Sequence, residues 1–191
     1  MEKILFIDAA VRAESRTRRL AEYLIGKLDG ETEHLVLETS GLKPLSGETV
    51  TWRDSCVARG DYSDGFFRFA RQLADVDTVV IAAPFWDNSF PSMLKVYIEN
   101  VSVSGLTFRY TEDGIPQGLC RANRLYYVTS AGGTIYNDAY SYGYVRDTFT
   151  TMFGIPETHF IKAENLDIWG ANPEKLLSDA ERRIDRLLIQ T

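Results

Sequence analysis

The sequence predicts an α/β domain in which a five-stranded parallel sheet carries helices on both faces. Five short apolar runs are typical of buried strands, and segments with helical periodicity alternate with them along the chain. No internal repeat or low-complexity tract interrupts this alternation. A length of 191 residues suits one domain, so we expect residues 1–191 to form a single domain.

The composition and the cysteine content limit the class of protein and its binding partners. Hydrophobic residues make up 45 % of the chain, enough for a core that needs neither disulfides nor a metal. A net charge of −6 argues against nucleic acid and anionic membrane surfaces as partners. Met1–Ile4 leads directly into a strand-like run rather than a signal region, so we expect a cytoplasmic protein. Cys56 and Cys120 are far apart, and no metal-ligand spacing accompanies them, so we expect no metal site.

The first half of the chain is expected to supply three strands. Lys3–Asp8 and Thr78–Ala83 are apolar runs that predict buried parallel strands, and His34–Leu37 is a shorter candidate. Residues 39–62 contain glycine and proline with little periodicity, which predicts a long surface connection. Apolar residues at helical spacing predict helices over 20–28, 66–74 and 91–101.

The second half is expected to add a hairpin and two more strands. Residues 105–119 alternate in polarity around the Asp113-Gly114 turn signal, which predicts a small β-hairpin. The remaining elements are expected in this order: strand Arg124–Thr129, a helix over 144–153, strand Thr158–Lys162 and a final helix that Asn172 caps and Pro173 opens.

Polar loops follow the first, third and fourth predicted strands. They cover residues 9–17, 84–90 and 130–136. The carboxyl ends of parallel strands meet at one edge of a sheet, where ligands of such folds bind. The sequence therefore predicts that these loops form one site.

The first loop has the features of an anion site. Ser15 and Thr17 lie at the start of the predicted helix, where hydroxyls, free amides and the helix dipole favour an anion such as a monophosphate. Arg12, Arg16 and Arg18 add positive charge. A simple helix cap with solvated arginines explains this loop alone equally well. Glycine-rich dinucleotide and P-loop motifs are absent from the sequence.

The other two loops have the features of a ring-binding site. Phe85 and Trp86 follow a buried strand, and the polar Asp87 and Asn88 stand beside them, which suits a flat heteroaromatic ring. The alternative is that these aromatics pack under the hairpin or in a dimer interface, which is the simpler explanation of this loop alone. In the third loop, paired glycines permit a backbone to approach a ligand closely, although strand-to-helix turns commonly contain glycine.

Three blocks of sequence carry a resemblance to a known family. Residues 79–101 read V-V-I-A-A-P-F-W-D-N-S-F-P-S-M-L-K-V-Y-I-E-N-V, residues 105–119 read G-L-T-F-R-Y-T-E-D-G-I-P-Q-G-L, and residues 129–133 read T-S-A-G-G. They are similar to the A-P-M-Y-N-F-x-x-P-x-x-L-K, G-x-T-F-x-Y-T-x-x-G-x-x-G-L and T-S-x-G-G blocks of the flavodoxin-like NAD(P)H-dependent oxidoreductases. This group includes FMN-dependent azoreductases and NAD(P)H:quinone reductases. The resemblance covers most of the chain and implies a three-layer flavodoxin-like fold with strand order 2-1-3-4-5.

The resemblance also implies a set of FMN-binding residues. Ser15, Arg16 and Thr17 match the loop that binds the FMN phosphate. The segment along the isoalloxazine ring and the ribityl chain is matched by Pro84, Phe85, Trp86, Asp87 and Asn88. The loop near the pyrimidine edge of the ring is matched by Ser130, Gly132 and Gly133, with Tyr136 beside them.

The implied activity is an FMN-dependent NAD(P)H oxidoreductase. NADH or NADPH would reduce the flavin, and a quinone, azo compound or similar small acceptor would then take two electrons in a ping-pong sequence. The flavin carries the chemistry, so no side chain is expected to be a catalytic residue. Family members are usually dimers, which implies a homodimer in which Tyr110 and the hairpin cover a neighbouring subunit's site.

Two departures from the family pattern keep alternatives open. Ala9-Ala10-Val11 stands where members often carry serine, and Asp87 stands where an amide is usual. A carboxylate near the flavin would disfavour the anionic reduced form and lower the redox potential. The first alternative is a flavodoxin-type one-electron carrier, and the second is a flavin-free binding protein on the same fold.

Overall fold

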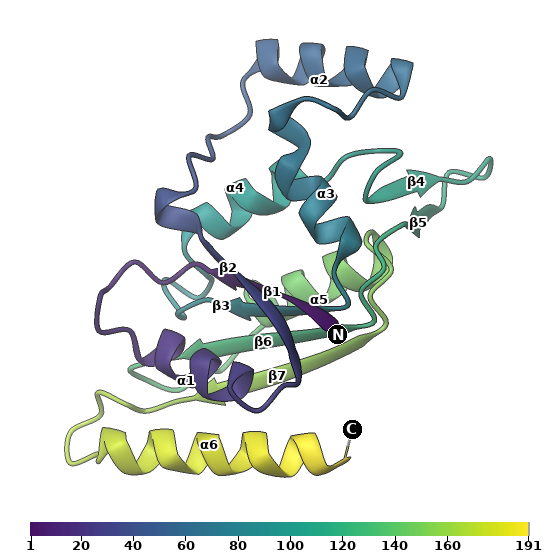
Figure 1. The fold of residues 1–191 in the computed structure, drawn as a ribbon. Coiled ribbons are helices and arrows are strands. Elements are labelled where there is room, and N and C mark those ends of the chain that lie inside the picture. The colour runs from purple at the N-terminus through teal and green to yellow at the C-terminus, as the bar shows by residue number, and fades with distance from the viewer. Residues whose placement is uncertain (191) are drawn as a thin grey trace.

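A parallel sheet of five strands forms the centre of the computed structural model, which describes residues 1–190 (Figure 1). Its strands are, in spatial order, β2 (Gly30–Val36), β1 (Glu2–Asp8), β3 (Thr78–Ala82), β6 (Arg124–Ser130) and β7 (Glu157–Ala163). Every neighbouring pair in this sheet is parallel. Because β4 and β5 form a separate hairpin, the order corresponds to the predicted 2-1-3-4-5, which is confirmed.

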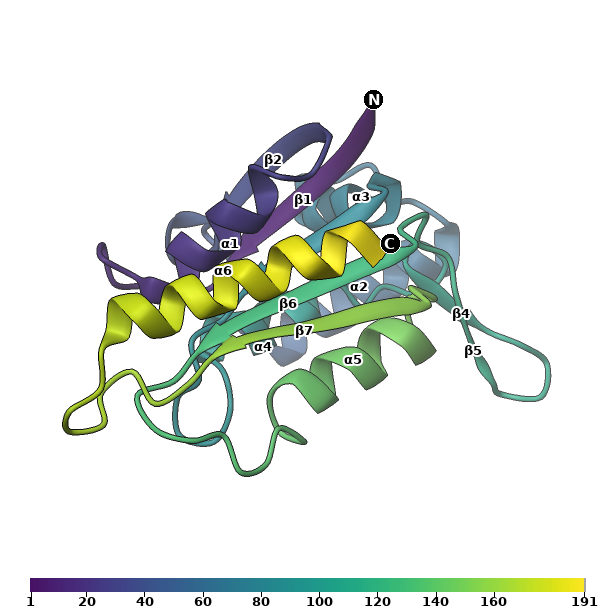
Figure 2. The same cartoon turned by 90° about the horizontal axis from the view of Figure 1, so that it is seen from below.

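Helices cover both faces of the sheet, so the protein has three layers (Figures 1 and 2). Helices α1 (Arg16–Ile25) and α6 (Pro173–Gln190) pack on one face. Helices α3 (Arg68–Asp75), α4 (Ser92–Val101) and α5 (Tyr142–Thr151) pack on the other. Within residues 1–190, none of the helices has both the length and the apolar character that crossing a membrane requires.

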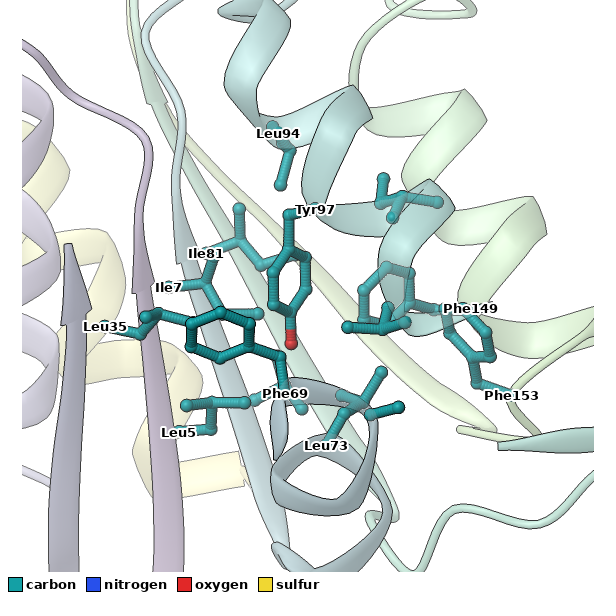
Figure 3. Close-up of a cluster of buried hydrophobic side chains, with 14 of the residues drawn as sticks. Leu5, Ile7, Leu35, Phe69, Leu73, Ile81, Leu94, Tyr97, Phe149 and Phe153 are labelled. Carbon is teal, nitrogen blue, oxygen red and sulfur yellow. The ribbon is translucent and has the colours of Figure 1, made fainter. Parts of the chain in front are cut away.

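The middle of each central strand is apolar because both of its faces are buried. In β1, Leu5 and Ile7 belong to the core beneath α3 and α4, whereas Ile4 and Phe6 belong to the core beneath α1 and α6. Figure 3 shows the first of these cores, with Tyr97 of α4 directed toward α3. This two-sided burial is the physical reason that the strand positions could be predicted from apolar runs.

The expectation of a continuous surface connection over residues 39–62 is wrong. The segment contains α2 (Gly47–Arg59), which Ser46 caps by accepting a hydrogen bond from the Thr49 amide at 3.1 Å. Most of α2 faces solvent, so its sequence lacks a strong apolar stripe. Trp52 stacks on Phe67 with ring centroids 5.8 Å apart, and the buried Cys56 adds a second anchor. The serine before the helix and the glycine after it were the available signals.

Smaller differences concern where elements begin. Strand β2 starts at Gly30, four residues before the prediction, because it is an edge strand whose residues 31–34 are exposed and polar. Helix α1 starts at Arg16, directly after its Ser15 cap, which confirms the expectation that Ser15 and Thr17 lie at the start of this helix. The predicted final helix is confirmed, with the Asn172 side chain accepting a hydrogen bond from the Lys175 amide.

The predicted hairpin is also confirmed, as β4 (Phe108–Tyr110) and β5 (Pro116–Gly118). A Cβ atom on Gly118 would lie 2.2 Å from the Gly154 amide nitrogen, so only glycine allows the hairpin to pack against the chain after α5. The hairpin projects from the end of the sheet at which the parallel strands begin (Figures 1 and 2). It therefore projects away from the loops that follow the strands.

We expect Ile81→Ala to lower the free energy of unfolding by about 2–5 kcal/mol, because it removes part of a fully buried side chain and leaves a cavity. Urea unfolding followed by circular dichroism measures this change. The matched control is Ile115→Ala, at a position that is 60 % exposed in the hairpin, with an expected change below about 0.5 kcal/mol. Equal losses in both variants would contradict the assignment of Ile81 to the core.

Candidate functional site

Four loops meet around a cavity of about 360 Å³ at the carboxyl edge of the sheet. They follow β1, β3, β6 and β7, and the predicted convergence of the first three is confirmed. The lining residues are Arg12, Glu14, Ser15, Arg16, Thr17, Pro84, Phe85, Trp86, Ser130, Ala131, Gly132, Leu166 and Asp167. The structure thus brings together most of the predicted site residues.

The loop after β7 is the part of the site that sequence reasoning missed. Leu166 and Asp167 line the cavity from this loop. The rule that ligands bind at the carboxyl ends of parallel strands applies to the fifth strand as well as to the others. Its polar continuation, Glu164-Asn165-Leu166-Asp167, was therefore an available signal.

The N-terminus of α1 supplies donors to the cavity. Ser15 caps the helix by accepting a hydrogen bond from the Arg18 amide at 3.2 Å. The first amides of a helix have no carbonyl partner within it, and those of Arg16 and Thr17 occupy these positions. The Thr17 hydroxyl lies 2.7 Å from the hydroxyl of Ser130, which joins the helix to the loop after β6. This combination of hydroxyls and free amides at the positive end of a helix suits an anion.

An ion pair on the interior side of the first loop fixes the path of its backbone. The Asp8 carboxylate is buried at the end of β1, and Arg18 Nε donates to its Oδ2 at 2.5 Å. The same guanidinium donates to the carbonyls of Ala10 at 2.5 Å, Arg12 at 2.9 Å and Ala13 at 3.0 Å. Arg18 is therefore occupied by the loop backbone and by Asp8. The expectation that it adds positive charge at the ligand site is wrong.

The departure at Ala9-Ala10 has a structural explanation. Both alanines are buried, so their methyl groups belong to the interior rather than to the cavity. The Ala10 amide donates to Asp8 Oδ1 at 2.9 Å. The lining residues that carry hydroxyl groups are instead Ser15, Thr17 and Ser130.

The second loop makes a tight turn that separates its aromatic residues from its polar ones. Trp86 and Ser89 exchange backbone hydrogen bonds of 3.0 Å and 2.7 Å. Asp87 and Asn88 occupy the centre of the turn with φ values of 50° and 62°, as a type I′ turn requires. Phe85 and Trp86 line the cavity, whereas Asp87 and Asn88 lie exposed at the tip of the turn.

The third and fourth loops are fastened to each other. The Asp167 amide donates to the Gly132 carbonyl at 2.9 Å, and the Asn165 amide donates to the Gly133 carbonyl at 3.1 Å. A Cβ atom on Gly132 would lie 2.6 Å from Asp167 Oδ2, so the glycine leaves room for the Asp167 side chain in its present position. Gly133 lies outside the cavity lining, as does Tyr136, which is 93 % exposed.

The charges that line the cavity balance. Arg12 and Arg16 are positive, and Glu14 and Asp167 are negative. Arg16 Nη1 donates to Asp167 Oδ1 at 2.7 Å. Attraction for an anion therefore comes mainly from the end of α1 and its hydroxyls.

The arrangement fits FMN, which has a monophosphate at one end and a flat ring system at the other. The donor set at the start of α1 suits the phosphate, because amides and hydroxyls hold such groups at helix N-termini. Phe85 and Trp86 offer apolar surface on the adjoining wall for a ring. The polar and the aromatic parts of the site come from neighbouring strands, β1 and β3.

We expect Asp8→Asn to lower the free energy of unfolding by about 3 kcal/mol, because it leaves the Arg18 guanidinium without its buried counter-ion. Chemical denaturation measures the loss. Glu174→Gln is the matched control, because it breaks the solvent-exposed pair with Arg19 and should cost less than about 1 kcal/mol. Similar small effects in both variants would show that the Asp8–Arg18 pair does not hold the loop.

Comparisons with known proteins identify the family of this chain. The profile of a family described by its flavodoxin-like fold matches residues 2–188. An FMN-dependent NADH:quinone oxidoreductase of Clostridium perfringens is 34 % identical over 188 residues, which cover 94 % of each chain. A second protein of that name, from Clostridium acetobutylicum, is 35 % identical over 190 residues, or 93 % of each chain.

The solved structures show the same fold. An FMN-dependent NADH-azoreductase from Bacillus anthracis, in complex with FMN, aligns with a TM-score of 0.81. This alignment covers 100 % of the present chain and 99 % of the other, at 21 % identity. The match of the family profile and the identity to the clostridial proteins confirm the predicted family. The chain therefore belongs to the flavodoxin-like fold family, in the group that contains these clostridial oxidoreductases.

Proposed function

We propose that this protein is an FMN-dependent NADH:quinone oxidoreductase. The observation that carries the proposal is the cavity where the N-terminus of α1 meets the aromatic wall formed by Phe85 and Trp86. This cavity offers an anion site and a ring site within one space. The clostridial relatives that carry this name are similar over nearly their whole length, which supports the same activity for this chain.

Each wall of the cavity has a role in holding the cofactor. The amides of Arg16 and Thr17, with the hydroxyls of Ser15, Thr17 and Ser130, bind the phosphate. Pro84, Phe85 and Trp86 hold the ring, and Gly132 brings the fourth loop close. Asp87, Asn88, Gly133 and Tyr136 complete the proposed set as contacts at the rim. FMN, when bound, supplies the two-electron chemistry, while the chain binds and orients it.

The size of the cavity bears on the order of the reaction. A volume of about 360 Å³ is near the lower end for small-molecule sites, so one cofactor would occupy most of it. The nicotinamide and the acceptor would then use the same open side in turn, as a ping-pong sequence requires.

We extend the proposal to NADPH beside NADH as donor, and to azo compounds beside quinones as acceptors.

We also propose that the protein is a homodimer. The hairpin stands beside the amino ends of the strands (Figures 1 and 2), whereas the cavity lies at their carboxyl ends, so the hairpin does not cover the site of its own chain. Tyr110 and Ile115 on it are 58 % and 60 % exposed. Exposed apolar side chains on a projecting arm are typical of an interaction surface. In a dimer, the hairpin of one subunit would cover the site of the other.

The proposal predicts a flavin spectrum that responds to NADH. The purified protein is incubated with FMN, desalted and examined by visible absorption, and NADH or NADPH is then added without oxygen. We expect retained flavin bands that bleach on the addition of NADH, because the cavity holds the cofactor with its ring accessible. A quinone added afterwards should restore the bands.

Other results of this experiment would contradict the proposal. Retained bands that persist with both nicotinamides would indicate a flavodoxin-type carrier. A colourless protein after desalting, and an FMN titration without binding, would indicate a flavin-free protein on this fold.

Size-exclusion chromatography of wild type and of Tyr110→Arg tests the dimer, and a monomeric wild type would contradict it.

A further inference from the structure

One acidic residue pairs with an arginine beside the proposed phosphate site. Asp167 lines the cavity and engages Arg16, one of the two arginines in the lining. We propose that Asp167 competes with the FMN phosphate for Arg16, and so weakens FMN binding and sets how readily the cofactor exchanges. This inference rests on the proposed function, because it assumes that FMN occupies this cavity.

The position of the Asp167 backbone is fixed by the adjoining loop. Hydrogen bonds run from the amides of Asn165, Leu166 and Asp167 to the carbonyls of Gly133, Ala131 and Gly132, at 3.1, 3.2 and 2.9 Å. The absence of a side chain on Gly132 makes room for the carboxylate, since a Cβ atom there would lie 2.6 Å from Asp167 Oδ2. The backbone of this loop therefore places the Asp167 carboxylate at the wall of the cavity.

The carboxylate and a phosphate have the same requirements at Arg16. Both are anions that accept hydrogen bonds from a guanidinium, and Asp167 Oδ1 already accepts from Arg16 Nη1 at 2.7 Å. A phosphate that reaches Arg16 must displace this carboxylate or lie beside it. Displacement breaks the Arg16–Asp167 pair, and a phosphate that lies beside the carboxylate is repelled by its like charge. Either arrangement therefore lowers the affinity of the cavity for FMN.

The exposure of the pair makes exchange possible. The Arg16 and Asp167 side chains are 40 % and 64 % exposed, so solvent screens their attraction. In the Asp8–Arg18 pair, by contrast, the Asp8 side chain is fully buried. The Asp8–Arg18 pair thus maintains the loop, whereas the Arg16–Asp167 pair can open when an anion arrives.

The test is the Asp167→Asn variant, which keeps the shape of the side chain and removes its charge. Isothermal titration calorimetry measures the Kd for FMN and for riboflavin, which lacks the phosphate. We expect FMN to bind about fivefold tighter to the variant, the gain that a partly exposed charge pair allows. Riboflavin should bind with unchanged affinity. Because the predicted change is a gain, loss of folding cannot imitate it.

Two further variants separate competition for Arg16 from a general effect of charge. Glu14→Gln removes a negative charge from the same cavity, while Arg16 stays paired with Asp167. We expect it to change the Kd for FMN by less than about twofold, because no competing contact is removed. In an Arg16→Gln background, Asp167→Asn should give no gain.

The outcomes distinguish this inference from the function on which it rests. Unchanged or weaker FMN binding by Asp167→Asn, while the wild type binds FMN, would overturn the inference and leave the proposed function in place. Equal gains in Glu14→Gln and Asp167→Asn would also overturn it. Failure of both wild type and Asp167→Asn to bind FMN would overturn the inference and the proposed function together.

Discussion

The buried ion pair between Asp8 and Arg18 links the end of a central strand to the first turn of α1, and the geometry of the site depends on it. The guanidinium also gathers the carbonyls of the intervening loop, at Ala10, Arg12 and Ala13. Because one side chain occupies all of these acceptors, the loop has a defined path. That path places the start of α1, with its free amides and its hydroxyl-bearing residues, in the lining of the cavity, where an anion can use them.

The rest of the site is assembled by contacts between loops. Thr17 on α1 meets Ser130 after β6, and the backbone after β7 is bound to the backbone after β6. The turn after β3 is fastened by Ser89, whose hydroxyl donates to the Tyr140 carbonyl at 2.6 Å. Each loop therefore holds its neighbour, and the cavity is formed by all four. An ion pair at its wall, Arg16–Asp167, is placed where it can respond to the charge of a ligand.

Much of the fold could be predicted because the central strands are buried on both faces and therefore carry unbroken apolar runs, as Lys3–Asp8 and Thr78–Ala83 do. The convergence of the loops then follows from the parallel sheet. Helix α2 could not be predicted from periodicity because it is mostly exposed, and the start of β2 was hidden by its polar, exposed residues. Asp87 and Asn88 belong to a turn with positive φ that places them at its tip. The partnership of Arg16 with Asp167 joins residues 151 positions apart, so only the folded chain shows it.

The central claim is that FMN binds in this cavity with its phosphate at the start of α1. Backbone amide chemical shifts of the ¹⁵N-labelled protein, recorded while FMN is added, test it most directly. The account predicts that the largest changes occur at Ser15, Arg16 and Thr17, with further changes at Phe85, Trp86 and Gly132, and that riboflavin perturbs the second group but barely the first. The larger cavity beside β2 and α3, lined by Lys3 and Arg71, offers a contrasting location. Changes centred there, or equal changes at Ser15–Thr17 with FMN and with riboflavin, would contradict the account.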